Sequence, residues 1–231
     1  MRIISGRFRR RTLQANPGNT TRPITDRAKV ILFDNIERHF QGRHVLDIFC
    51  GTGSLGLEAL SRGASTCVFI EQDHRAFELL KANIAHVGAN EIAIPWRISA
   101  LQSSLKPKGT DWLPYGLVFF DPPYVMLKDV RPGLPLHRML TRLARPDITT
   151  DDVLMVIRGP EDASYTLPDC WSIERTMRVG SMQLAFIRKV PGMFPEATET
   201  DTMSDTGADD SVEDAPSKDG GEVPATEEPS A

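Results

Sequence analysis

The glycine-rich segment 51–56, Gly-Thr-Gly-Ser-Leu-Gly, constrains the fold of this chain more than any other feature. It follows an apolar run at residues 45–50 and opens a predicted helix that ends near Gly63. A strand, a glycine turn and a helix begin a βαβ unit in which the backbone can approach an adenosine-containing ligand. Glu71 ends the next apolar run, residues 67–70, where an acid typically binds ribose hydroxyls. The alternative is a tight strand-to-helix turn with no ligand.

Predicted strands and helices alternate along most of the chain. Helices are expected at residues 25–40, 51–63, 73–87 and 136–144, and strands at 45–50, 67–70, 92–98, 117–120, 153–157, 172–177 and 182–187. This order indicates an α/β protein with a mostly parallel seven-stranded sheet, helices on both faces and a terminal hairpin. Thr25 is the expected N-cap of the first helix. In such a sheet the fourth strand lies beside the first, so the loops that follow these two strands are neighbours.

The fourth predicted strand ends in Asp121-Pro122-Pro123-Tyr124. Two prolines fix two φ angles and supply no N–H, so the chain leaves the sheet in a stiff extended turn. A carboxylate, the carbonyl of Pro122 and an aromatic ring suit a flat molecule that carries an amino group, such as a nucleobase. The alternative is a Pro-Pro turn with an incidental acid.

Charge divides the chain into a basic body and an acidic tail. Residues 191–231 contain twelve acidic residues and one lysine, so this segment cannot build a core and is expected to be disordered. The whole chain has a formal net charge of −4, which leaves residues 1–190 at +7. We therefore expect three parts: a basic N-terminal arm (1–22), a folded domain (23–190) and an acidic tail (191–231).

The first 22 residues are predicted to form an extended arm, with short alternations of apolar and basic residues. Arginines here can contact nucleic-acid phosphates, and an aromatic ring among them can stack on a base. The alternative is a solvated basic edge that discourages sheet pairing. Four arginines are the candidate RNA contacts: Arg7, Arg9, Arg10 and Arg11.

Three cysteines, Cys50, Cys67 and Cys170, are too few and too scattered for a disulfide framework or a zinc cluster. Buried free thiols in a reducing compartment are expected instead. No apolar run approaches the roughly 20 residues of a membrane span, and the N-terminus has no secretory signal. We expect a cytoplasmic protein with no metal and no membrane partner.

S-adenosylmethionine fits the two loops better than a nicotinamide cofactor, for which the chain has no second mononucleotide-binding half. Asp47, just before the glycines, is placed to meet the methionine ammonium group, and residues after the third strand would flank the adenine. Each acid has a structural alternative, because Asp47 can order the turn and Glu71 can be a solvated strand end; Ser99 can be a helix cap. The candidate cofactor contacts are Asp47, Gly51, Gly53, Glu71, Ser99 and Ala100.

The candidate catalytic residues are Asp121, Pro122 and Tyr124. An exocyclic amine on a purine is a poor nucleophile, because its lone pair is delocalised into the ring. Two acceptors, the Asp121 carboxylate and the Pro122 carbonyl, can bond its two N–H groups and turn the lone pair toward a sulfonium methyl group. Tyr124 can stack on the base, a contact worth about 1–3 kcal/mol. A base within a duplex must first be flipped out.

Together these motifs resemble the RsmD family of ribosomal RNA methyltransferases. The resemblance covers residues 1–190 and is carried by segments 2–6, 22–27 and 45–63 and by Asp-Pro-Pro-Tyr. It implies a Rossmann-like class I S-adenosylmethionine-dependent methyltransferase fold and methylation of N2 of a guanine in 16S ribosomal RNA. It also implies the cofactor and catalytic contacts named above, and it places Arg22 near the active-site mouth as an RNA contact.

The chain departs from the family pattern at two positions, since Ser99 replaces an Asp or Asn and Ile157-Arg158 stands where a Glu ends the fifth strand. The Asp-Pro-Pro-Tyr motif is shared with adenine N6 methyltransferases of DNA and RNA, which gives a second hypothesis. A third is a non-catalytic RNA-binding or assembly protein. The expected partner is small-subunit ribosomal RNA, free or in an assembling subunit, bound by a monomer.

Overall fold

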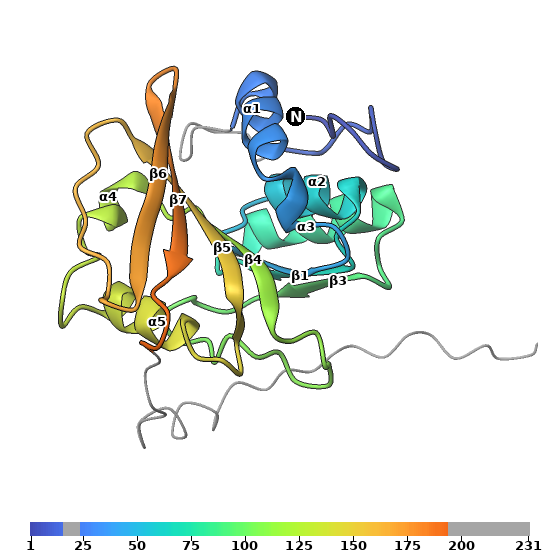
Figure 1. Ribbon diagram of the computed structural model, residues 1–231. Coiled ribbons are helices and arrows are strands. Elements are labelled where there is room, and N and C mark those ends of the chain that lie inside the picture. The colour runs from blue at the N-terminus through green and yellow to red at the C-terminus, as the bar shows by residue number, and fades with distance from the viewer. Residues whose placement is uncertain (16–23, 194–231) are drawn as a thin grey trace, which may run out of the picture.

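A seven-stranded sheet with helices on both faces forms the body of the protein (Figure 1), as predicted. The computed structural model describes residues 1–15 and 24–193. The elements, in chain order, are α1 (Asp26–Asn35), the 3₁₀ turn η1 (Glu37–His39), β1 (His44–Ile48), α2 (Ser54–Arg62), β2 (Thr66–Ile70), α3 (His74–Val87), β3 (Ala93–Trp96), β4 (Tyr115–Phe120), α4 (Tyr124–Leu127), α5 (Pro135–Leu143), β5 (Thr149–Pro160), β6 (Trp171–Val179) and β7 (Met182–Lys189).

The strand order is β3-β2-β1-β4-β5-β7-β6. The first five strands in this order are parallel, and β7 pairs antiparallel with both β5 and β6. The predicted pairing of the first and fourth strands is confirmed, with Asp47 opposite Phe119 and Ile48 opposite Phe120. The sheet therefore reverses its winding between β1 and β4, the position where doubly wound sheets bind ligands.

Local signals set most helix boundaries. Thr25 is the N-cap of α1, as predicted, and its hydroxyl accepts a backbone N–H at 3.2 Å. Asp73 caps α3 in the same way at 2.8 Å. Gly63 and Gly88 follow α2 and α3 in the left-handed conformation that ends a helix. The helix expected at 25–40 is shorter, because α1 ends at Asn35 and a 3₁₀ turn follows.

Two elements differ from the pattern-based expectation. Strand β5 extends well beyond the predicted residues 153–157, because it pairs with β4 on one side and continues along β7 as far as Pro160. The short helix α4 begins at Tyr124, directly after the two prolines, where only an extended turn was expected. Both differences alter the surroundings of Asp121.

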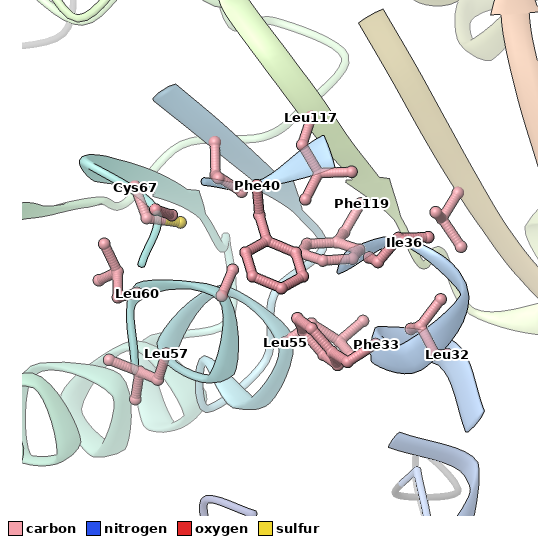
Figure 2. Close-up of a cluster of buried hydrophobic side chains, with 14 of the residues drawn as sticks. Leu32, Phe33, Ile36, Phe40, Leu55, Leu57, Leu60, Cys67, Leu117 and Phe119 are labelled. Atoms are coloured by element: carbon pink, nitrogen blue, oxygen red, sulfur yellow. The ribbon is translucent and has the colours of Figure 1, made fainter. Parts of the chain in front are cut away.

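The sheet separates two apolar clusters. One packs α1, α2 and α3 against one face of the sheet, and the other packs α4 and α5 against the opposite face, as Figure 1 also shows. Figure 2 shows the centre of the first cluster, where Phe33 and Phe40 meet Phe119 of β4 and the leucines of α2. The Phe33 ring lies 5.8 Å from both other rings, centroid to centroid. Truncating such a side chain to alanine typically costs about 3–5 kcal/mol.

The N-terminal segment, residues 1–15, is folded back onto the domain instead of extended as predicted. Arg2 and Thr12 form an antiparallel bridge, and Ile3, Phe8 and Leu13 are buried in the first apolar cluster. The apolar positions had indicated a strand, but their side chains are buried in the core, and backbone N–H groups of the segment bond side chains of α2 and α3. The expected contact Arg22 and the expected tail beyond residue 193 lie outside the described residues.

Candidate active site

The loops that follow β1, β2 and β4 meet at one edge of the sheet. The Asp121 N–H donates to the carbonyl of Ile48 at 3.2 Å, and the Cys50 N–H donates to the carbonyl of Ile70 at the same distance. The glycine turn and the Asp-Pro-Pro-Tyr turn are thus side by side. The spatial relation on which the sequence interpretation depends is confirmed.

The glycine turn has a backbone shape that favours glycine. Gly51 and Gly53 have φ values of +56° and +84°. A Cβ on Gly53 would lie 2.5 Å from the Leu80 side chain, so this position also lacks room. Gly53 is the N-cap of α2 and contributes no side-chain hydrogen bond there. The first turn of α2 therefore has no cap from its N-cap residue, and the Asp47 side chain bonds the Gly56 N–H in this turn instead.

Asp47 is a buried acid with one oxygen bonded and one not. Its side chain lies at the end of β1, the residue is 1% exposed, and Oδ2 accepts the Gly56 N–H at 2.8 Å. Oδ1 has no hydrogen-bond partner among the residues that the structure describes. Burial raises the pKa of Asp47 to about 8, although the Gly56 hydrogen bond opposes the shift. A buried oxygen of this kind requires an explanation, and a ligand donor is one.

Glu71, half-buried at the end of β2, ties the glycine turn to the second strand. One carboxylate oxygen accepts the Gly51 N–H at 2.9 Å, and the other accepts the Asp73 N–H at 2.8 Å. Each carboxylate oxygen has a second lone pair, so these bonds leave acceptor capacity for ribose hydroxyls. The Glu71 side chain is therefore held beside the glycine turn by two backbone hydrogen bonds.

The residues expected beside adenine follow β3. The Glu71 N–H donates to the carbonyl of Trp96 at 3.2 Å, so the loop after β3 leaves the same sheet edge, beyond β2. Ser99 is half-buried and its carbonyl accepts N–H groups from Gln102 and Ser103, whereas Ala100 is 2% exposed and belongs to the second apolar cluster. The alternative role of Ser99, a helix cap, is not observed, because its backbone carbonyl closes a turn at this position.

The Asp121 carboxylate has a partner that the sequence pattern did not reveal. Arg158 of β5 donates from Nε to Asp121 Oδ1 at 2.8 Å. Burial raises the pKa of Asp121, and the charge and hydrogen bond of Arg158 oppose that rise. Pro122 is buried, and Tyr124 is half-buried against the second apolar cluster. The only sequence signal for Arg158 was its departure from the family pattern, which did not indicate a contact with Asp121.

A second residue missed by sequence reasoning is Asn83 of α3, which is fully buried. Its side chain exchanges two hydrogen bonds with the backbone of Gln14, at 2.8 and 3.0 Å, and donates to the carbonyl of Thr52 at 2.9 Å. It therefore joins the N-terminal segment to the glycine turn. An asparagine at one helical position carries no pattern by which this role could be predicted.

The N-terminal arginines lie at the surface, but Phe8 does not. Arg7, Arg9, Arg10 and Arg11 are all exposed, whereas Phe8 is 8% exposed and packs into the core. Arg11 donates to the carbonyl of His86 at 2.6 Å, and the Arg7 guanidinium carbon lies 4.6 Å from the centre of the Phe8 ring. The arginines thus form an exposed cationic surface, but the Phe8 ring, which was expected to stack on a base, packs in the core instead.

Two further observations concern the described residues alone. They contain no group of three or more His, Cys, Asp or Glu side chains arranged to hold a metal ion. None of their helices is both long enough and apolar enough to cross a membrane. The three cysteines are free, with Cys67 and Cys170 buried and Cys50 half-buried.

Comparison with known proteins gives consistent matches. The family described as "Conserved hypothetical protein 95" matches residues 1–188. "Putative rRNA methyltransferase YlbH" of Bacillus subtilis is 38% identical over 169 residues, covering 73% of this chain and 86% of that protein. "Ribosomal RNA small subunit methyltransferase D" of Escherichia coli K12 is 33% identical over 183 residues, 79% of this chain and 86% of that protein.

Solved structures share the fold. "Putative methyltransferase yhhF" from Escherichia coli superposes with a TM-score of 0.66 at 33% identity, covering 82% of this chain and 97% of that one. An RNA methyltransferase from Salinibacter ruber in complex with S-adenosyl-L-homocysteine has a TM-score of 0.55 at 12% identity, over 76% of this chain and 98% of that one. The latter likeness shows the class I methyltransferase fold alone.

Proposed function

The chain belongs to the RsmD family of ribosomal RNA methyltransferases, and from this premise we propose that it methylates the exocyclic N2 amine of a guanine in 16S ribosomal RNA. The methyl donor is S-adenosylmethionine. The observation that carries the proposal is the direct contact between the two turns, in which the N–H of Asp121 bonds the last residue of β1. This contact sets a cofactor loop beside a loop that can hold an amine.

The residues present fit S-adenosylmethionine. The Oδ1 atom of Asp47, which no described residue bonds, is an acceptor for the donor group of a ligand. The glycine turn has open space beside Gly51, where an added Cβ would meet nothing within 4 Å, and Glu71 retains acceptor capacity for ribose hydroxyls. When bound, the cofactor supplies an electrophilic methyl group on a sulfonium. The proposed cofactor contacts are Asp47, Gly51, Gly53, Glu71, Ser99 and Ala100.

The Asp-Pro-Pro-Tyr turn would hold the amine. Asp121 and the carbonyl of Pro122 accept its two N–H groups and orient the nitrogen lone pair, while Tyr124 stacks on the guanine. The amine held in this way would accept the methyl group that the bound cofactor supplies, and its nitrogen would release one proton to solvent. Asp121, as a carboxylate, stabilises the positive charge that develops on nitrogen. No metal takes part in this scheme.

A three-part chain fits this reaction: a docked basic segment within residues 1–22, the methyltransferase domain at 23–190 and the acidic tail at 191–231. Arg7, Arg9, Arg10, Arg11 and Arg22 would contact RNA phosphates, which supply affinity without sequence information. We propose that the protein acts as a monomer in the cytoplasm, on free RNA or on an assembling small subunit.

Methyl transfer can be tested with labelled S-adenosylmethionine and ribosomal RNA or small subunits from a strain that lacks the gene. We expect label on N2 of one guanine, lost when Asp121 is replaced by Asn. Label on adenine would contradict the base assignment. Transfer to duplex DNA but not to RNA would instead favour the adenine N6 methyltransferase hypothesis.

A further inference from the structure

We propose that Arg158 is a positioning residue for methyl transfer, which holds the Asp121 carboxylate in the orientation and the ionised state that the substrate amine requires. The inference rests on the proposed function and adds to it a residue that lies on a different strand from the Asp-Pro-Pro-Tyr turn.

Strand register places Arg158 level with Asp121. Phe120 pairs with Ile157 across β4 and β5, so the next residue on each strand reaches the same edge of the sheet. The Arg158 Nε to Asp121 Oδ1 distance is 2.8 Å, and the two side chains are 10% and 15% exposed. The guanidinium carbon also lies 6.0 Å from the centre of the Tyr124 ring. Arg158 thus bonds Asp121 and lies near the ring of Tyr124, two of the three proposed catalytic residues.

Fold stability alone does not account for this ion pair. Strands β4 and β5 already pair in regular register from Leu117 to Phe120, next to Asp121, and α4 packs on β5, with Leu127 beside Gly159. A buried ion pair gains little over apolar side chains of similar volume, because both charges lose their hydration. An ion pair that contributes little stability but fixes a site carboxylate is better explained by the chemistry of the site.

Two physical effects follow from the contact. The Nε hydrogen bond holds Oδ1 of the carboxylate, so it restricts rotation of this group and sets its orientation toward the amine. The guanidinium charge also favours the ionised form, whereas burial favours the protonated form. A protonated Asp121 would present an O–H donor toward an N–H donor, and the orienting hydrogen bond would be lost.

Every charged group that faces Asp121 bears on its titration. Arg158 of β5 favours ionisation of Asp121, and the charge of Asp121 in turn raises the pKa of Asp47 of β1. Glu71 of β2 acts on Asp47, and Tyr124 of α4 contributes its ring beside the guanidinium. Arg158 is the cation of this set, so its removal shifts the pKa of Asp121 upward and moves the acidic limb of the rate profile to higher pH.

The test compares the pH profiles of wild type, R158M and R158K in the methyl-transfer assay. We expect R158M to lower kcat about 10- to 100-fold at neutral pH and to shift the acidic limb to higher pH, with KM for S-adenosylmethionine unchanged. R158K keeps the positive charge but lacks the guanidinium Nε that bonds Asp121. The acidic limb of its pH profile should therefore stay at the wild-type pH, while kcat is reduced. R175M is the matched control, because Arg175 stacks 3.8 Å from the Phe186 ring centre on the far strand pair.

Carboxyl NMR titration of Asp121 supplies a readout that needs no substrate, and it should show a higher pKa in R158M than in wild type. If the pKa of Asp121 is the same in R158M as in wild type, the inference is overturned, whatever the activity of the variant. An R158K variant with wild-type kcat would overturn it too, including the case in which R158M does not fold. A wild type that methylates no RNA, together with the expected NMR shift, would instead contradict the proposed function.

Discussion

Two buried carboxylates on consecutive elements of this protein differ in how many hydrogen bonds they accept. Glu58 of α2 is fully buried, and its oxygens accept from the backbone N–H groups of Ile4 and Ser5 at 2.8 and 3.0 Å and from Arg62 Nε at 2.8 Å. Asp47 of β1 is buried to the same degree but accepts one hydrogen bond, from Gly56. The three hydrogen bonds to Glu58 indicate a structural role, whereas the unsatisfied oxygen of Asp47 supports the ligand contact that we propose for it.

The charged groups around these two acids also differ in whether they are paired within the chain. Around Glu58, the fully buried Lys29 lies 3.6 Å from the carboxylate and donates to the carbonyl of Arg2, so every charge meets a partner from the chain itself. Around Asp47, the neighbouring charges are Asp121 and Glu71 of the same sign, opposed by Arg158. The first region stabilises the fold, whereas the second accepts an electrostatic cost that a ligand can relieve.

The largest effect is expected from Glu58→Gln. It leaves the Lys29 ammonium buried without its countercharge, and breaking a buried ion pair in this way costs about 3–5 kcal/mol. The free energy of unfolding from urea denaturation measures the loss. The matched control is Glu78→Gln, because the Glu78–Lys81 pair is exposed and such pairs contribute about 0–1 kcal/mol. Equal losses in both variants would contradict the structural role of Glu58.

Asp121→Asn should leave the fold intact and reduce kcat/KM about 10²- to 10³-fold, because the amide cannot stabilise positive charge on the amine nitrogen. Labelled methyl transfer to ribosomal RNA measures the change, with circular dichroism as the check on folding. Activity within a factor of about two of wild type would remove Asp121 from the catalytic set.

Asp47→Asn should change stability in the direction opposite to Glu58→Gln. The folded pKa of Asp47 is about 8 against an ordinary 3.8, so the unfolded chain binds fewer protons between these values and wild-type stability falls as pH rises from 4 to 8. The amide removes this loss and should stabilise the fold by about 1–3 kcal/mol at pH 8 while weakening S-adenosylmethionine binding. Thermal unfolding across this pH range and calorimetric titration with the cofactor measure the two effects. A variant less stable than wild type at pH 8 would contradict the comparison.

The smallest effect on the folded protein is expected from the double substitution of Arg9 and Arg10 by Ala. Both side chains are exposed on the N-terminal turn, so stability should change by about 0.5 kcal/mol or less. RNA affinity should fall, and the slope of log affinity against log salt should decrease by about 1–2. Electrophoretic mobility shifts at several salt concentrations measure this slope. An unchanged slope would show that these arginines do not contact phosphate.

The candidate site residues that could be predicted are those marked by a short sequence pattern around them. Gly51, Gly53 and Asp47 follow from the order of strand, turn and helix, and Asp121 follows from the Pro-Pro turn that ends a strand. Arg158 and Asn83 could not be predicted, because their partners lie 37 and 69 residues away in the chain. The N-terminal segment was placed wrongly, because a short apolar alternation indicates a strand equally whether it pairs with a sheet or packs onto helices.

The sequence alone determined the doubly wound fold, with β4 beside β1 and a ligand site expected where these two strands end. The signals were periodicity, caps and turn residues, which act over a few neighbouring positions. Tertiary structure alone decided which buried charges are satisfied: Glu58 by the returning N-terminal segment, Asp121 by Arg158, and Asp47 only on one oxygen. The physical reason is that hydrogen bonds form over about 3 Å in space, and strand register and helix packing set those distances between residues far apart in the chain.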